Sequence, residues 1–517
     1  MSLLAIDIGS SQCKAVAFTA AGAILARSAC AYSPEFPQPT FAEMDPEMFW
    51  RAVCKTSREV TRDLAHDPVQ AVCFSSHGET FIPVNAQGEA IGPAILNIDS
   101  RASRETKWLE NEIGARRIFE ITGLVAFTMY PLPKILWLRE HRPEIYAEAD
   151  RFLSVTDFIH VKLGLPPYVG YSLASRFLAF NVTRDRWSNE ILNAAGLTEA
   201  RLPLPVPAAT VAGKMNSEAA NALGVGNGTP VVVGGHDQAC GALGVGAIRS
   251  GRVSDSMGTY ECLTAVSDEP RLGDEAFTAR LNSYCHVVPG NFLTLAYFPS
   301  GIMVQWFRDL IYGHGARWKE VTAAAAATGE RNEYSGLEAE CRGIPTGLCV
   351  TPHLIGTCNP DFDPRARATI FGLASDSSRS QIYQGILEGI ACELAQMTEL
   401  LASVNGRFRD LYVTGGGTRS PLGLKLRAAI TGCRLHVMQC DEAVCQGAAI
   451  LAGVATGVYS RIEEAVELVV REKEVVEPDA RLATLYAGQV KQYRRLCAAL
   501  KSLRDANSCA ESEGEKP

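Results

Sequence analysis

One pattern of strand, acidic residue, small-residue turn and returning strand occurs twice in this chain, in segments far apart. The first copy is the apolar run 3–8, the turn Gly9-Ser10-Ser11 and a second apolar run. The second copy is the run 251–256, the turn Met257-Gly258-Thr259 and another apolar run. Each copy predicts a β-hairpin. A repeat of this kind predicts two related halves, which we expect to meet near residue 246.

Strand-like and helix-like segments alternate along much of the chain. The run 230–237 predicts a buried strand that leads into a helix over 238–247, and the strand 410–414 leads in the same way into a helix over 422–431. A helix over 45–65 begins with residues that suit an N-cap and a first helical position. This alternation is typical of the α/β class with mixed sheets.

The two halves give the expected domain organisation. We expect one domain over residues 1–246 and a second over 247–490. Residues 491–517 are expected to hold the end of a C-terminal helix and a tail. Because 508–517 is polar and charged, we expect that tail to be disordered.

Composition excludes several classes of protein. Of the 517 residues, 47% are hydrophobic and 21% charged, which excludes a mainly disordered chain. A net charge of −8 repels phosphate backbones, so we expect no nucleic-acid partner. No signal peptide and no run of 18 apolar residues occurs, which predicts a cytoplasmic protein without a membrane partner. The 16 cysteines form no CxxC pair and are expected to be reduced and buried.

The first hairpin carries the residue types that bind phosphate. The turn Gly9-Ser10-Ser11 offers backbone amides and hydroxyls, and Lys14 offers a positive charge. Asp7, at the end of its strand, suits a hydrated Mg²⁺ ion. An ordinary turn whose aspartate caps local amides is the alternative. Because Gly258 and Thr259 repeat this chemistry, the pair favours a nucleotide held in a cleft between the two halves.

A third glycine-rich turn follows a predicted strand and opens a helix. It reads Gly415-Gly416-Gly417-Thr418-Arg419-Ser420. Its glycines let backbone lie flat against a ring or a phosphate, and the helix N-terminus adds positive potential. A tight strand-to-helix turn without a ligand is the alternative. The sequence has neither GxGxxG nor GxxxxGK[ST], which argues against the Rossmann and P-loop classes.

Polar residues at three other strand ends are candidates for substrate contact. Asp237 follows a buried strand and suits a general base, with the N-cap of the next helix as the alternative. Its neighbour His236 is more often a structural hydrogen-bonding group. The remaining candidates, for which surface loops are the alternative, are His77, Glu79, Asn97 and Asp99. Polyol recognition needs such clustered donors and acceptors.

Taken in order, these motifs resemble those of the FGGY carbohydrate kinases, which belong to the superfamily of sugar kinases, actin and heat-shock-70 proteins. The resemblance covers about residues 3–455. The matching segments are Asp7–Lys14, Glu43-Met44-Asp45-Pro46, Gly234–Gln238, Gly258-Thr259, Gly415–Leu422 and Glu442–Ala449. The resemblance implies two ribonuclease H-like α/β domains with an interdomain cleft. It also implies sugar binding in the first domain and ATP binding in the second.

The resemblance implies a role for each matching residue. Asp237 would take the proton of the substrate hydroxyl, and Asp7 and Asp237 would hold Mg²⁺. The ATP contacts would come from Gly9, Ser10, Ser11, Lys14, Gly258, Thr259, Gly415, Gly416, Gly417, Ser420 and Glu442. The sugar contacts would come from His77, Glu79, Asn97, Asp99, His236 and Asp237.

The pocket residues depart from the family pattern and leave the substrate open. His77-Gly78 is similar to the corresponding motif of xylulokinases, and Glu79-Thr80 to that of glycerol kinases. Asn97-x-Asp99 is similar to the corresponding motif of autoinducer-2 kinases. We expect ATP-dependent phosphorylation of a small neutral polyhydroxy substrate, with a ketose such as xylulose favoured. Glycerol, erythritol, ribulose or an autoinducer-2-like compound are alternatives, as is a non-catalytic, regulatory actin-like ATP-binding protein. The resemblance also implies that the protein can assemble as a homodimer.

Overall fold

The computed structural model describes residues 2–62, 64, 67–313 and 334–514. The chain forms two compact units that interleave in sequence. Unit 1 comprises Met1–Ser250, Thr264–Thr294 and Glu442–Arg471, and unit 2 comprises Gly251–Leu263, Leu295–Asp441 and Glu472–Pro517. The sequence domains 1–246 and 247–490 stay a prediction, because these contact-based units interleave.

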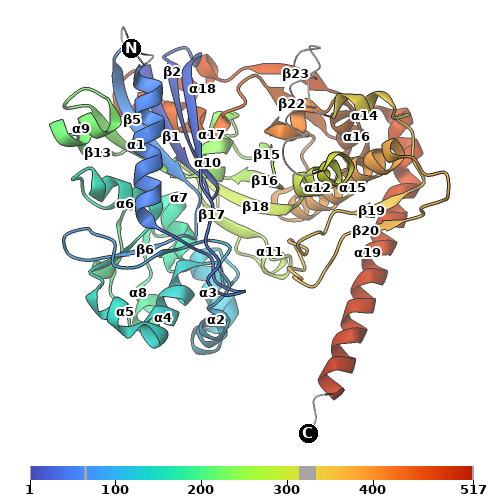
Figure 1. Ribbon diagram of the computed structural model, residues 1–517, viewed down its shortest axis with the longest axis horizontal. Helices are drawn as coiled ribbons and strands as arrows, with labels where there is room; N and C mark the ends of the chain where they lie inside the picture. Colours follow the sequence, from blue (N-terminus) through green and yellow to red (C-terminus); the bar gives the residue numbers. More distant parts are fainter. Residues whose placement is uncertain (1, 63, 65–66, 314–333, 515–517) are drawn as a thin grey trace. The chain divides into compact units, whose positions relative to one another are not determined.

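A six-stranded sheet forms the centre of unit 1 (Figure 1). Its order is β13-β14-β5-β1-β2-β3, with bounds Val211–Lys214, Pro230–His236, Val69–Ser76, Ser2–Ile8, Gln12–Thr19 and Ile24–Ala31. Strands β14, β5 and β1 are parallel, whereas β2, β3 and β13 pair antiparallel to their neighbours. Parallel strands covered on both faces need near-continuous apolar sequence, which the run 3–6 of β1 supplies.

Helices cover both faces of this sheet. Leu4 and the side chains that alternate with it join the core formed with α1 (Pro46–Arg62). The neighbouring residue Leu3 points the other way and contacts α17 (Ala443–Ala455), because successive strand residues face opposite sides. Helix α17, far along the chain, therefore lies beside β1, as Figure 1 shows.

A second core lies within unit 1, under the helices that follow β7 (Ala94–Ile95). Its helices are α2 (Ser103–Leu109), α3 (Ala115–Thr122), α4 (Pro131–His141), α5 (Pro143–Glu148), α7 (Tyr171–Ala174) and α8 (Asn189–Ala195). The other short strands and helices of the unit are β4 (Glu43–Met44), β6 (Ile82–Val84), β8 (Arg151–Leu153), α6 (Val155–Lys162), β9 (Tyr168–Gly170), β10 (Phe180–Asn181), β11 (Arg186–Trp187), β12 (Leu204–Val206), α9 (Ser217–Leu223), α10 (Asp237–Gly244), α11 (Asp274–Thr278) and α18 (Ile462–Val469).

A seven-stranded sheet has the order β17-β18-β16-β15-β21-β22-β23. The bounds are Asn282–Cys285, Phe292–Pro299, Tyr260–Ser267, Val253–Met257, Asp410–Thr414, Arg434–Met438 and Glu472–Val476. Other described elements of unit 2 are α12 (Gly301–Tyr312), α14 (Ser335–Ala339), β19 (Cys349–Thr351), β20 (Thr369–Phe371), α15 (Arg379–Asn405), α16 (Pro421–Thr431) and α19 (Ala480–Gly514). The two hairpins, β1–β2 and β15–β16, occupy the positions that the repeat predicts.

The α/β class and most element positions predicted from the sequence are confirmed. Between Ser103 and Thr122 the chain forms α2, a π-helical turn over Glu110–Gly114, and α3. Helix α19 has bounds that reach into the tail predicted to be disordered, and the disorder of that tail stays a prediction. Residues 515–517 lie outside the described part of the chain.

None of the described helices combines the length and the apolar character that crossing a membrane requires.

Candidate active site

Two carboxylates meet at one edge of the sheet of unit 1. Asp7 lies near the end of β1, and Asp237 follows the last residue of β14. Both strands run parallel to β5, and Ser76 of β5 is in register with Ile8 and with His236. The carboxyl ends of parallel strands share an edge, so this topology brings the two aspartates together.

Close backbone packing lets β14 reach that edge. A Cβ atom on Gly234 would lie 2.1 Å from the Phe74 carbonyl oxygen, and one on Gly235 would lie 2.3 Å from the Ser172 hydroxyl. Helix α10, which begins at Asp237, packs equally closely on α17. A Cβ on Gly244 would lie 1.9 Å from the Ala443 carbonyl oxygen. The small residues that the sequence places here are therefore required by the fold.

The aspartates hold protons more tightly than ordinary carboxyl groups. Burial raises the pKa of Asp7 to about 6, against the hydrogen bond that the Ser75 hydroxyl donates at 3.0 Å. Burial also raises the pKa of Asp237 well above its usual range, and the charges of Asp7 and Glu79 add to the rise. Two carboxylates that repel each other at a sheet edge suit a divalent cation with oxygen ligands, so the residues fit Mg²⁺.

Neighbouring groups orient the Asp237 carboxylate. Its Oδ1 accepts a hydrogen bond of 2.6 Å from the Gln238 amide, and His236 Nε2 lies 3.2 Å from the same oxygen. Burial lowers the pKa of His236 to about 3, so the ring is neutral. His236 Nδ1 is buried and has no hydrogen-bond partner in the described structure. A neutral ring that carries its proton on Nε2 therefore faces Asp237 and keeps Nδ1 as an acceptor.

The first phosphate hairpin has the expected turn. The Gly9 amide donates to the Gln12 carbonyl at 2.9 Å, and Tyr32 binds the turn from outside through the Gly9 and Ser11 carbonyls. In the described part of the chain, the hydroxyls of Ser10 and Ser11 make no hydrogen bond. The turn therefore keeps its hydroxyls available for a ligand.

Lys14 and Glu442, both predicted to bind the nucleotide, form an ion pair of 2.9 Å. Burial acts to lower the pKa of Lys14, but Glu442 outweighs it and the pKa is raised. Lys14 is also in register with Asp7 across β1 and β2. The ion pair therefore keeps Lys14 positively charged. It lies beside Asp7, the carboxylate of the same hairpin that suits Mg²⁺.

Glu79 is held by a buried arginine that the sequence reasoning missed. Arg176 Nε lies 2.5 Å from Glu79 Oε1, and both side chains are almost fully buried. Burial acts to raise the pKa of Glu79, but the Arg176 guanidinium outweighs it and holds the pKa below its usual value. The second guanidinium nitrogen, Nη1, has no hydrogen-bond partner in the described structure. Glu79 also has a positive φ of 62°, a costly conformation that is frequent at functional positions.

This arginine–glutamate pair lies next to His236, the residue that precedes the candidate base. A Cβ on Gly78 would be 3.0 Å from Arg176 Cγ and 3.0 Å from His236 Cδ2. A second buried cation, Lys134 Nζ, donates to the carbonyls of Glu79 and Leu96 at 2.8 Å. Burial lowers the pKa of Lys134 to about 7. Arg176 and Lys134 each interrupt an apolar run, and a lone cation of that kind is the signal that could have identified them.

The other predicted pocket residues divide into two kinds. Asn97 Oδ1 is buried without a hydrogen-bond partner in the described structure and is free to accept one. Both ring nitrogens of His77 are engaged, Nδ1 with the Ile8 carbonyl at 2.9 Å and Nε2 with the Thr80 hydroxyl at 2.8 Å. Asp99 is a partner of Arg101, at 2.8 Å, and of the Ala42 amide. His77 and Asp99 therefore act through protein contacts in this structure.

In unit 2, the second phosphate hairpin is braced by the start of α12. The Gly301 amide donates to the Gly258 carbonyl and the Ser300 amide to the Thr259 carbonyl, each at 3.1 Å. Gly258 and Thr259 are themselves exposed. Asp255, the counterpart of Asp7 in the repeat, is only 1% exposed, and burial followed by the charge of Glu261 raises its pKa well above the usual range. The two hairpins thus share a backbone pattern but differ in the charges around the aspartate. Asp7 has Lys14 and Glu442 as its charged neighbours, whereas Asp255 has Glu261 and Arg427.

The three consecutive glycines of unit 2, Gly415 to Gly417, have different surroundings. Gly415, with φ of 91°, would place a Cβ 2.7 Å from the Met257 carbonyl oxygen, and Gly417 packs on the Met257 side chain. A Cβ on Gly416 would meet nothing within 4 Å, so its backbone is open to a ligand. The Ser420 hydroxyl accepts a hydrogen bond from the Gly423 amide at 2.9 Å and caps α16.

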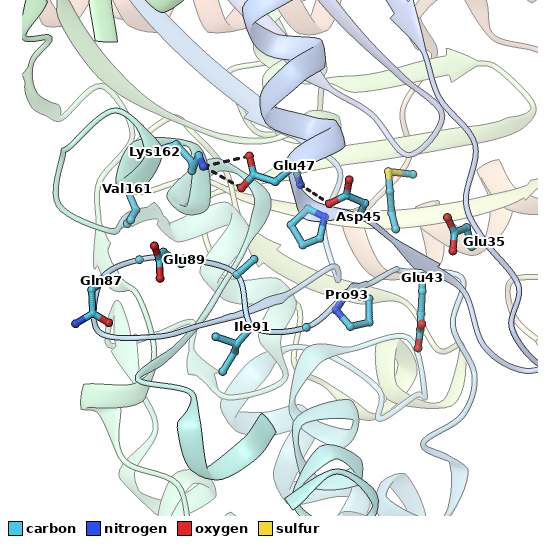
Figure 2. Close-up of a pocket in the computed structure, with 15 residues that line it drawn as sticks. Glu35, Glu43, Asp45, Glu47, Gln87, Glu89, Ile91, Pro93, Val161 and Lys162 are labelled. Carbon is cyan, nitrogen blue, oxygen red and sulfur yellow. Dashed lines mark hydrogen bonds and ion pairs between the residues drawn. The ribbon is translucent and has the colours of Figure 1, made fainter. Parts of the chain in front are cut away.

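A pocket of about 790 Å³ in unit 1 contains none of the predicted site residues (Figure 2). Four glutamates and Asp45 line it. Ion pairs neutralise part of this charge. Lys162 binds Glu47 at 2.9 Å (Figure 2), and Arg101 binds Glu43 at 2.7 Å. The excess of acidic side chains makes this pocket unsuitable for a phosphorylated ligand.

Comparisons with known proteins identify the family. Residues 2–244 match the N-terminal domain of the FGGY family of carbohydrate kinases, and residues 253–456 match its C-terminal domain. Xylulose kinase of Lactococcus lactis is 25% identical over 476 residues, which cover 91% of each chain. Gluconokinase of Bacillus subtilis is 27% identical over 458 residues, which cover 88% of each chain.

Solved structures agree with this fold. A ligand-bound xylulose kinase from Lactobacillus acidophilus has a TM-score of 0.86 at 21% identity and covers 97% of this chain and 98% of its own. Plasmodium falciparum glycerol kinase with ADP has a TM-score of 0.82 at 19% identity and covers 96% and 97%. The two-domain α/β fold is therefore confirmed. The chain belongs to the FGGY family of carbohydrate kinases, which transfer phosphate from ATP to an alcohol group.

Proposed function

We propose that this protein phosphorylates a small, neutral polyhydroxy substrate, with a ketose such as xylulose favoured, and that Asp237 is its general base. The observation that carries the proposal is the Asp237 carboxylate itself. It lies at the sheet edge beside Asp7, and its raised pKa makes it a stronger base than an ordinary aspartate.

The proposal gives different roles to the two oxygens of Asp237. Oδ1 is engaged by the Gln238 amide and faces the ring of His236. Oδ2 is then the oxygen that accepts the proton of the substrate hydroxyl. His236 Nδ1, buried and without a partner, would accept a hydrogen bond from a second hydroxyl.

Unpartnered polar atoms of two side chains in unit 1 support the proposed substrate contacts. Asn97 Oδ1 would accept a hydrogen bond, and Arg176 Nη1 would donate one. Glu79 would accept a hydroxyl hydrogen while its charge is balanced by Arg176. His77 and Asp99, whose polar atoms are already bonded to protein, would shape the pocket from behind. Because the Glu79–Arg176 pair is neutral overall, this arrangement favours a neutral polyol.

The proposed nucleotide contacts lie on the glycine-rich turns. Ser10, Ser11 and Lys14 of the first hairpin, with Gly9, would bind phosphate oxygens, as would Gly258 and Thr259. Gly415, Gly416 and Gly417 would lie against adenosine or the α-phosphate, with Gly416 the most open of the three. Ser420 would support this turn as a helix cap, and Glu442 would act through Lys14.

Asp7 and Asp237 would hold Mg²⁺, which when bound neutralises charge on the transferring phosphoryl group. Asp237 would combine this with its role as base, with Oδ2 toward the substrate hydroxyl. A cytoplasmic location and assembly as a homodimer also stay predictions.

An acidic sugar such as gluconate is a second candidate substrate. One relative is a gluconokinase, and Arg176 Nη1 is a buried cationic donor without a partner. A carboxylate would pair with that donor. It would also approach the carboxylates of Glu79 and Asp237, and for this reason we rank it second.

A coupled assay of ADP release distinguishes these substrates. The purified protein is given ATP, Mg²⁺ and one of xylulose, ribulose, glycerol, erythritol or gluconate. We expect the highest kcat/KM for a neutral ketose. A kcat/KM for gluconate at least tenfold above every neutral compound would contradict the proposed class. Absence of turnover with all of them, together with ATP binding, would point to an autoinducer-2-like or other substrate.

A further inference from the structure

A buried glutamate in unit 1 lacks the partners that a carboxylate needs. Glu105 of α2 is 4% exposed, and neither of its oxygens accepts a hydrogen bond in the described structure. Leaving such a group unpaired is costly, because its hydration is lost without replacement. The missing partner is the first sign that something binds here.

Two further ligand groups converge on this carboxylate from the end of α4. One oxygen of Glu105, one oxygen of Glu140 and one ring nitrogen of His141 all lie within 4.8 Å of one another. Glu140 and His141 are exposed, so the group opens to solvent. A bound ion could enter without any change in the core.

The ring of His141 is oriented as a metal ligand. Its Nδ1 lies 3.1 Å from the Trp137 carbonyl oxygen, which can only accept, so Nδ1 carries the hydrogen. The ring also stacks on Trp137, with centroids 4.7 Å apart and planes inclined by 8°. A neutral ring held in this way presents the lone pair of Nε2. A backbone carbonyl that fixes the second nitrogen is the usual support of a metal-binding histidine.

We propose that Glu105, Glu140 and His141 bind a divalent transition-metal ion, Zn²⁺ above all, that fastens α2 to the C-terminal end of α4. Two carboxylate oxygens and one imidazole nitrogen form a ligand set typical of Zn²⁺, with water completing the coordination. In a tetrahedral Zn²⁺ site with bonds of about 2.1 Å, two ligand atoms lie about 3.4 Å apart. The ligand atoms here, within 4.8 Å of one another, would have to close by up to about 1.4 Å, which rotation of the exposed side chains of Glu140 and His141 can supply.

Local charge favours a cation at this position. The side chains of Glu105 and Glu140 bring two carboxylates together here. The last carbonyls of α4 also direct negative potential toward its end. A protonated His141 that pairs with the two glutamates, with no metal, is the competing arrangement.

The site would brace the region that holds the substrate pocket. Helix α2 follows directly after Arg101, the partner of Asp99, and α4 carries Lys134. The ion would be structural, since none of its three ligands belongs to the set proposed to contact substrate or ATP.

Calorimetry with the metal alone tests the site. Full-length protein is stripped with EDTA and titrated with ZnCl₂, together with the variants Glu105→Gln and His141→Gln. Glu144→Gln, which removes an exposed carboxylate from the neighbouring helix α5, is the matched control. We expect wild type and control to share one binding event that weakens at least tenfold in both test variants. An unchanged isotherm in His141→Gln would overturn the proposal.

Two direct observations separate this site from the cysteines. Co²⁺ bound here should show weak visible absorption that disappears in His141→Gln, without thiolate charge-transfer bands. Crystals soaked in ZnCl₂ should give an anomalous peak between the three side chains. Zinc found only at cysteines or at Asp7 would overturn the proposal, as would His141 bonded to the glutamates with no peak between them.

Discussion

Replacing Arg176 by methionine removes a buried cation and leaves Glu79 uncompensated. The ion pair is 2.5 Å long and nearly inaccessible to water, and breaking such a pair costs about 3–5 kcal/mol. The entropy of unfolding is about 0.6 kcal/mol/K for a unit of about 300 residues. We therefore expect Arg176→Met to lower the midpoint of the first thermal transition by about 5–8 °C in calorimetry at pH 7.

A second substitution separates stability from function. In Glu79→Gln/Arg176→Met no buried charge is left unpaired, so we expect at least half of the lost thermal stability to return. The donor that we assign to the substrate is still absent. We therefore expect kcat/KM of the double variant to stay reduced by about 10–100-fold, as loss of a charged hydrogen bond predicts.

Two results would refute this reasoning. A melting temperature of Arg176→Met within about 1 °C of wild type would mean that the pair is not a buried, desolvated one. Full recovery of kcat/KM in the double variant would mean that neither side chain contacts the substrate. Arg117→Met is the matched control, because its ion pair with Glu190 is exposed and is expected to contribute little.

Three further predictions address the pocket, the nucleotide and the metal. Asn97→Trp should shift kcat/KM among neutral substrates by about tenfold, about 1.4 kcal/mol, while basal ATP hydrolysis persists; an unchanged substrate profile would remove Asn97 from the pocket. Gly258→Val places two methyl groups on an exposed turn and should weaken ATP binding in calorimetry, whereas equal affinity in a folded variant would make the turn purely structural. Because burial raises the pKa of Asp7 to about 6, protons compete with Mg²⁺ for this carboxylate as the pH falls. The apparent KM for Mg²⁺ should therefore rise about fivefold from pH 6 to pH 5. An apparent KM that does not change with pH would contradict the assignment of Asp7 as a metal ligand.

The sequence was sufficient for the fold because its signals are local. The glycine turns at Gly9 and Gly258 and the strand before Asp237 fix hairpins and strand ends over a few residues. The alternation of strand and helix then fixes the class. The polar composition of 508–517 predicts disorder, whereas the bounds of α19 reach Gly514, so disorder of the tail stays a prediction.

The candidate site was predictable only in part, because its partners come from distant segments. Arg176 and Lys134 reach Glu79 from other parts of the chain, and local reasoning about acidic and basic neighbours found neither. Pairing decides whether a polar side chain faces substrate or protein. Asn97 keeps a free acceptor, whereas Asp99 is occupied by Arg101, and their spacing in sequence does not reveal that difference.

The turnover of Asp237→Asn with the substrate identified by the ADP-release assay tests the central claim most directly. Asparagine keeps the size of the side chain but removes the oxygen that accepts the proton. We predict that kcat falls by about 10²-fold or more, a barrier increase of about 2.7 kcal/mol, while calorimetric binding of sugar changes little. Turnover within a few-fold of wild type would contradict the assignment of Asp237 as the base.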